Sequence, residues 1–170
     1  MNVRIITPAP PRSRTGNRVT ALRWARVLAR LGHRVKLAGA YRDEPCHLMI
    51  ALHARRSHAA IARYRERRPQ GPLIVALTGT DLYGDIRNDA NARRSLEMAQ
   101  RLVALQPKAL EELTPALRQK THIILQSVPP RRSRSAPNKT TFDVAVVGHL
   151  RQVKDPFLAA AAARLLPEDS

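Results

Sequence analysis

Residues 72–77 read Pro72-Leu73-Ile74-Val75-Ala76-Leu77, a run without a charged side chain, and Thr78-Gly79-Thr80-Asp81 follows directly. A short continuous apolar run is typical of a strand that is buried on both faces of a parallel sheet. Residues 57–67 before it and 88–100 after it have the pattern of helices. Helix, strand and helix in this order predict an α/β fold.

The rest of the chain repeats this alternation of short apolar runs and amphipathic segments. Further strands are predicted over residues 3–7, 35–39, 47–52, 102–105 and 122–125. A helix is predicted from Asn17, as its N-cap, to the residue before Gly32, and another from Pro107 to Leu113. Together they predict a parallel sheet flanked by helices and joined by right-handed crossovers.

The composition changes after residue 126. Residues 127–141 contain three prolines, the basic cluster Arg131-Arg132-Ser133-Arg134 and no long apolar run, which is typical of a linker. A new strand is predicted over 142–148 and a new helix over 155–166. We therefore expect a first domain over 1–126, a linker over 127–141 and, over 142–170, the first strand and helix of a truncated second domain.

Positive charge dominates the chain, with 30 Lys and Arg against 13 Asp and Glu and a formal net charge of +17. This balance indicates an anionic partner such as phosphate, nucleic acid or a membrane surface, or else a solvated arginine-rich surface. Aromatic residues make up only 4%, which disfavours stacking on single-stranded bases. With one cysteine and no run of about 20 apolar residues, we expect a cytoplasmic protein without disulfides or integral membrane association.

Ligands of open α/β sheets bind beyond the carboxyl ends of the strands, where four loops are predicted here. The first loop, residues 8–18, brings Arg12, Gly16, Asn17 and Arg18 to a helix N-terminus. Free N–H groups and convergent arginines favour an anion there. The alternative is a proline-rich turn followed by an ordinary helix cap.

The next two loops hold the candidate catalytic residues. His53 follows a strand and can donate to a sugar hydroxyl or a phosphate, or it is a solvent-facing loop histidine. Thr80 and Asp81 follow the strand over 72–77, and small residues there allow close backbone approach. Asp81 can act as a base or orient a sugar hydroxyl, or it makes an Asx turn that caps a helix.

The fourth loop, residues 148–155, follows the strand predicted over 142–148. There the guanidinium of Arg151 can donate two parallel hydrogen bonds to a diphosphate, and Lys154 adds a point charge. The alternative is that both residues belong to a solvated basic turn. The other histidines show no metal-ligand spacing, and we expect no metal and no cofactor.

Five collinear stretches resemble glycosyltransferases of the GT-B fold, family-4 type, and within them the selenosugar synthases of selenoneine biosynthesis. The stretches are residues 7–11 (Thr-Pro-Ala-Pro-Pro), 16–25 (from Gly16 to Ala25), 51–57 (from Ala51 to Ser57), 76–83 (from Ala76 to Tyr83) and 148–156 (from Gly148 to Pro156). The resemblance implies two Rossmann-like domains with the active site between them. It also implies that selenophosphate attacks the anomeric carbon of a UDP-sugar, so that UDP leaves and a selenosugar results.

Carried over by position, the resemblance implies that His53 and Asp81 lie near the reacting sugar. Residues 16–18 would face the acceptor and the donor diphosphate, and Arg151 and Lys154 would stabilise the leaving diphosphate without a metal. His149 stands where the family usually has arginine, and the family's uridine and ribose motif would come after residue 170. We therefore expect this chain to be inactive alone and to need a complementing C-terminal domain.

Two other functions stay open. A basic nucleic-acid-binding module fits the net charge, although basic residues are spread over every helix and no recognition motif is present. A transferase with a lipid or sugar acceptor fits the basic helix from Asn17, but the sheet needs the apolar face of that helix.

Overall fold

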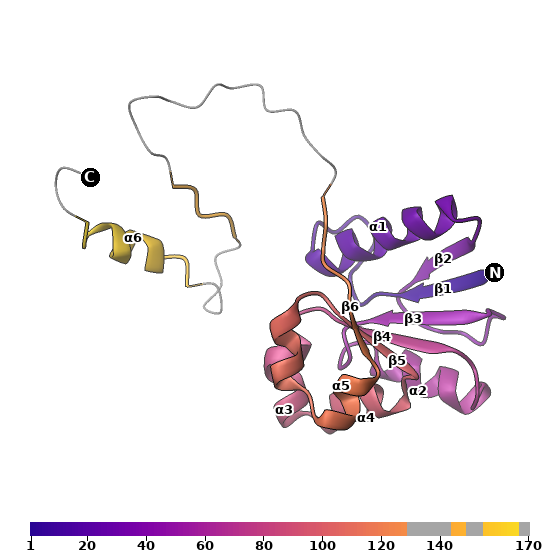
Figure 1. Ribbon diagram of the computed structural model, residues 1–170. Coiled ribbons are helices and arrows are strands. Elements are labelled where there is room, and N and C mark those ends of the chain that lie inside the picture. Colours follow the sequence, from indigo (N-terminus) through magenta and orange to yellow (C-terminus); the bar gives the residue numbers. More distant parts are fainter. Residues whose placement is uncertain (129–143, 149–154, 167–170) are drawn as a thin grey trace. The chain divides into compact units, whose positions relative to one another are not determined.

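The computed structural model describes residues 1–128, 144–148 and 155–166. The chain forms two compact units, Met1–Val128 and Pro129–Ser170. In the first unit, six strands make an entirely parallel sheet with helices on both faces (Figure 1). This arrangement is a Rossmann-like α/β fold, and it confirms the fold class that the alternating pattern predicts.

The strands lie in the order β2-β1-β3-β4-β5-β6. Their bounds are β1 (Asn2–Ile6), β2 (Arg34–Ala38), β3 (Leu48–Leu52), β4 (Leu73–Leu77), β5 (Arg101–Ala104) and β6 (Thr121–Ile123). From β1 the chain first adds β2 on one side and then adds β3 to β6 on the other. The order therefore reverses between β1 and β3, and this is the point where open α/β sheets form a crevice.

The helices divide unequally between the two faces of the sheet (Figure 1). The helical elements of this unit are α1 (Gly16–Arg30), α2 (His58–Arg67), the π-helical turn η1 (Asp81–Asp85), α3 (Ile86–Asn88), α4 (Ala90–Met98), the 3₁₀ helix η2 (Pro107–Glu112) and α5 (Pro115–Gln119). α1 packs Ala21 and Trp24 against Val3 and Ile5 of β1. The larger core lies on the opposite face, beneath α2 and α4.

The start of α1 differs from the sequence prediction. The helix begins at Gly16, and Thr15, with extended backbone, occupies the N-cap position. Asn17 is therefore already inside the first turn and cannot be the N-cap, because the carbonyl of Thr15 accepts from the N–H groups of Arg18 and Val19. Among the residues that the structure describes, no side chain caps this helix.

The end of α1 is as predicted. Gly32 has a φ of +83°, and its N–H donates to Ala29 while that of His33 donates to Leu28, each over 3.0 Å. This is a Schellman motif, in which the glycine takes the left-handed conformation that other residues resist.

Three further helical elements also differ from the sequence prediction. The helix predicted over 88–100 is α4, which starts later because Asp89 caps it by accepting from the N–H of Ala92 over 2.8 Å. The segment from Pro107 is a 3₁₀ helix, and α5 was not predicted because five residues are too few to show helical periodicity.

The second unit has one regular element among its described residues, the helix α6 (Leu158–Ala163), which lies within the helix predicted over 155–166. The strand predicted over 142–148 is not formed at residues 144–148, where Val144, Val146 and Val147 are exposed. A strand needs a hydrogen-bonding neighbour, and no described residue of this unit pairs with the segment. The predicted linker lies outside the described residues except for its first two positions.

No helix in the described part of the chain is long and apolar enough to span a membrane.

Candidate functional site

The candidate site lies where the order of the sheet reverses, at the carboxyl ends of β1, β3 and β4. Ile6 ends β1 and pairs with Ala51 of β3, and Leu52 ends β3 and pairs with Ala76 of β4. The loops that leave these strands therefore start side by side. They carry seven of the nine predicted site residues.

His53 is the first residue after β3 and is held in an unusual conformation. Its φ is +72°, in the left-handed region that costs a non-glycine residue on the order of 1 kcal/mol. Its N–H donates to Ala76 over 2.9 Å, and its carbonyl accepts from Ser57 over 3.0 Å. The side chain is 2% exposed. The backbone therefore aims a buried imidazole along the carboxyl edge, and the alternative of a solvent-facing loop histidine is not what the structure shows.

The imidazole of His53 contacts two polar side chains of the next loop. Nδ1 accepts from the N–H of Arg56 over 3.4 Å, so in the neutral ring the proton is on Nε2. Nε2 lies 3.2 Å from the hydroxyl of Thr80 and 3.8 Å from Oδ2 of Asp85. Burial lowers the pKa of His53, although the nearby carboxylate of Asp81 acts in the opposite direction. A neutral imidazole with an Nε2 proton can donate to an oxygen placed at this edge.

Asp81 is fully buried and holds two loops together. Oδ2 accepts from the N–H of Ala54 over 3.0 Å, and Oδ1 accepts from the N–H of Thr78 over 2.9 Å. Both oxygens are thus used by backbone donors, as in the Asx-type alternative. The geometry gives Asp81 a positioning role for the loop that carries His53, while Thr80, which is exposed, reaches the site surface.

Asp85 joins the site although sequence reasoning did not select it. Its Oδ2 lies 3.1 Å from Nε of Arg55, and its side chain is 21% exposed. Asp81 and Asp85 are four residues apart within one helical turn, a spacing that brings two side chains to one face. That spacing, directly after a buried strand, is the signal that could have identified Asp85.

The N-terminus of α1 supplies the second part of the site. Because no side chain caps α1, the N–H groups of its first residues, Gly16 and Asn17, face solvent or a ligand. A Cβ at Gly16 would have open space, with no atom within 4 Å. Nε of Arg18 is buried and has no hydrogen-bond partner among the described residues. Arg12 lies in the preceding loop, is exposed and has a φ of +67°.

The segment after β6 returns to α1. The amide of Gln126 donates to the hydroxyl of Thr20 over 2.8 Å, and the guanidinium of Arg23 donates to Ser127 over 2.7 Å. Arg151 and Lys154 lie outside the described residues, so their predicted diphosphate role stays a prediction. Within the described ranges, no three His, Cys, Asp or Glu side chains gather as ligands of a metal ion.

No protein-family model matches this sequence, and no curated protein matches it significantly. A functional proposal must therefore rest on the site geometry and on the sequence motifs.

Proposed function

We propose that this chain carries the acceptor side of a glycosyltransferase that moves a sugar from a UDP-sugar to selenophosphate. One observation carries the proposal. Two groups follow the neighbouring strands β1 and β3 at the switch point of a Rossmann-like sheet. After β3 comes the buried, neutral imidazole of His53. After β1 comes the N-terminus of α1, which has no side-chain cap and carries an Arg18 nitrogen without a partner among the described residues. The imidazole suits a sugar hydroxyl, and the helix N-terminus suits a phosphoryl group.

In the proposed reaction, the selenium of selenophosphate attacks the anomeric carbon of the UDP-sugar. The bond between that carbon and the diphosphate oxygen breaks, and UDP leaves with the electron pair. Arg18 and the first N–H groups of α1 hold anionic oxygens, and His53 holds a hydroxyl of the sugar. Asp81 fixes the loop of His53 through the N–H of Ala54.

Binding of selenophosphate under anaerobic conditions tests this proposal, because it does not require a complete donor site. Arg18→Met should weaken binding by about tenfold or more, since a charge-assisted hydrogen bond is worth about 1.5–3 kcal/mol. Arg30→Met, in the exposed last turn of the same helix, is the matched control and should bind as the wild type does. Equal affinities for Arg18→Met and Arg30→Met would remove the anion role from the helix N-terminus.

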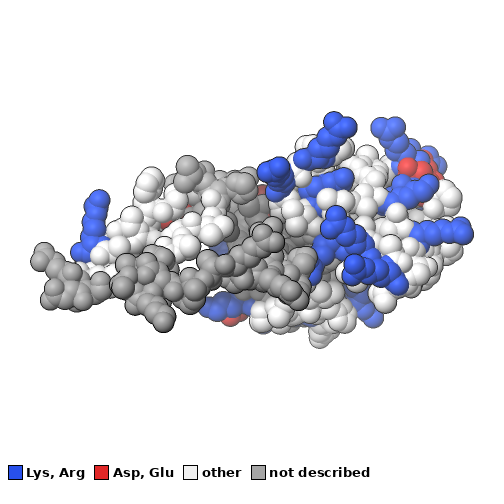
Figure 2. All heavy atoms as spheres, turned by 90° about the horizontal axis from the view of Figure 1, so that it is seen from above, with Lys and Arg blue, Asp and Glu red and all other residues white. Residues whose placement is uncertain are grey.

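Nucleic-acid binding is the second candidate, and the net charge of +17 is the observation that favours it. In Figure 2, which looks onto the side of α1, Lys and Arg occupy several separate places on the visible face. Such a dispersed distribution fits non-specific contacts to phosphates better than a shaped groove. Binding of this kind falls steeply with salt, whereas binding in a shaped small-molecule site falls far less.

A further inference from the structure

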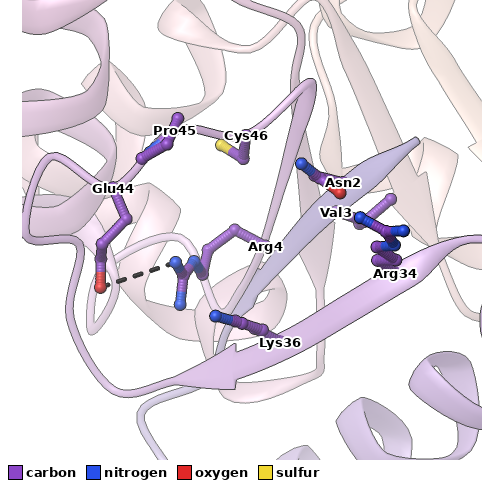
Figure 3. A pocket seen from close by; sticks show the side chains of 8 residues that line it. All are labelled: Asn2, Val3, Arg4, Arg34, Lys36, Glu44, Pro45 and Cys46. Carbon is purple, nitrogen blue, oxygen red and sulfur yellow. Dashed lines mark ion pairs between the residues drawn. The ribbon is translucent and has the colours of Figure 1, made fainter.

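A polar cavity beside β1 and β2 opens on the opposite face of the sheet from α1 and involves none of the candidate site residues. Its volume is about 630 Å³, within the range of small-molecule sites. Its lining residues are Asn2, Val3, Arg4, Arg34, Lys36, Glu44, Pro45 and Cys46. Figure 3 shows the strands β1 and β2 on one side and the segment 44–46 on the other.

The topology explains why cations line this cavity. Val35 and Leu37 of β2 pack on the α1 side, so Arg34 and Lys36 project from the opposite face by strand alternation. Arg4 of β1 is in register with Lys36, and Asn2 is in register with Arg34. The connection from β2 to β3, residues 39–47, contains no helix. This corner of the sheet is therefore left without the helical cover that the β3 to β5 region has.

Arg4 is the decisive residue of this cavity. It is only 8% exposed, and its one ionic partner among the described residues is Glu44, whose Oε1 lies 3.6 Å from the guanidinium. That distance is too long for a hydrogen bond. The other oxygen of Glu44 accepts from the N–H of Arg42 over 3.0 Å. The Arg4 guanidinium thus makes no hydrogen bond within the described residues. Its nitrogens are not among the fully buried unpartnered atoms, so they are reached from the cavity that Arg4 lines (Figure 3).

The charges of the cavity are also unbalanced. Three cations meet a single carboxylate, and cross-strand neighbours of like charge such as Arg4 and Lys36 repel each other. Cys46 adds no negative charge, because burial raises the pKa of its thiol. A doubly charged anion would relieve the repulsion. It would accept two parallel hydrogen bonds from an arginine and pair with the point charge of the lysine.

We propose that the Arg4–Lys36 cavity is a binding site for the phosphoryl group of a small phosphorylated molecule. The site lies on the amino half of β1 and β2, whereas the candidate active site lies beyond the carboxyl ends of the strands. Its enclosure by segment 44–46 favours a compact ligand over a polymer. The cavity is therefore a second site, separate from the one proposed for sugar transfer.

Titration of the full chain with inorganic pyrophosphate at constant ionic strength, followed by amide NMR, tests the proposal. Saturable shifts are expected at residues 2–4, 34–36 and 44–46. Lys36→Met, at an exposed position, should weaken binding at these signals by about tenfold. Glu44→Gln should strengthen binding about threefold, because it removes the competing carboxylate. Arg30→Met, on the other face of the sheet, is the control for lost charge.

Each of several results would overturn the proposal. They are the absence of saturable shifts at these strands, equal affinities for Lys36→Met and Arg30→Met, or unchanged or weaker binding in Glu44→Gln. Displacement of pyrophosphate from these signals by a short DNA duplex at lower concentration would also overturn it, in favour of a polymer. Because Glu44→Gln predicts a gain, a folding defect cannot imitate the expected result.

Discussion

His53 is buried, which disfavours the charged form of its imidazole. Its φ of +72° also places its backbone in a strained conformation. Burial lowers its pKa below the ordinary value of 6.5, so the unfolded chain binds this proton more readily than the folded one. The contribution of His53 to the unfolding free energy is therefore fully present above about pH 6.5. It is lost as the pH falls from there through the lower pKa of His53 in the folded state. His53→Asn, which tolerates the same backbone, should therefore flatten the fall in unfolding free energy between pH 7.5 and 5. A slope equal to that of the wild type would contradict this origin.

Asp81 is expected to act on stability rather than on proton transfer. Asp81→Asn keeps one oxygen but turns an amide donor toward a backbone N–H, at Ala54 or at Thr78. The loss should be about 2 kcal/mol in urea unfolding, because a buried donor loses its acceptor. Asp85→Asn, at the partly exposed neighbour, is the matched variant and should cost well under about 1 kcal/mol. Equal losses for the two variants would contradict the positioning role.

At the scale of elements, Lys120 closes the C-terminal end of α4. Its ammonium donates to the carbonyls of Leu96 and Ala99, each over 2.7 Å, and to that of Glu97 over 3.2 Å. They lie at the end of the helix, where carbonyls lack the regular backbone partner, although that of Leu96 also accepts from the N–H of Ala99 over 3.3 Å. Lys120→Met should lower the unfolding free energy by about 2 kcal/mol, and Lys108→Met, at an exposed position of η2, should leave it nearly unchanged. A thermal unfolding comparison that finds no difference between them would refute the capping role.

The elements also show how far the sequence predicts this structure. Strands such as β4 were predictable because a buried parallel strand is apolar throughout, and the end of α1 because Gly32 marks it. The π-helical turn η1 was not predictable from the sequence, because its shape depends on contacts between Asp81 and residues of another loop. The pairing of His53 with Thr80 was not predictable for the same reason. Strand order brings together residues that are 27 positions apart.

At the scale of the whole molecule, the fold places positively charged side chains at two separate sites. At the carboxyl edge of the sheet, Arg18 and the first N–H groups of α1 follow β1, whereas Arg4 and Lys36 line a cavity beside β1 and β2. Several other arginines of α1 and α2 bind neighbouring protein groups, as Arg63 does in its ion pair with Asp43 at 2.7 Å. The sequence indicated an anionic partner from the net charge alone. The arrangement of the strands shows which of these cations come together in space.

Amide NMR of the full chain, titrated with selenophosphate and then with a UDP-sugar at low and at physiological salt, tests the proposed function most directly. We expect saturable shifts at residues 16–20, 53–57 and 78–85 that survive physiological salt. Shifts spread over the surface that vanish with salt would contradict a shaped site and favour non-specific nucleic-acid binding. A complete lack of shifts at the carboxyl edge would contradict the glycosyltransferase proposal itself.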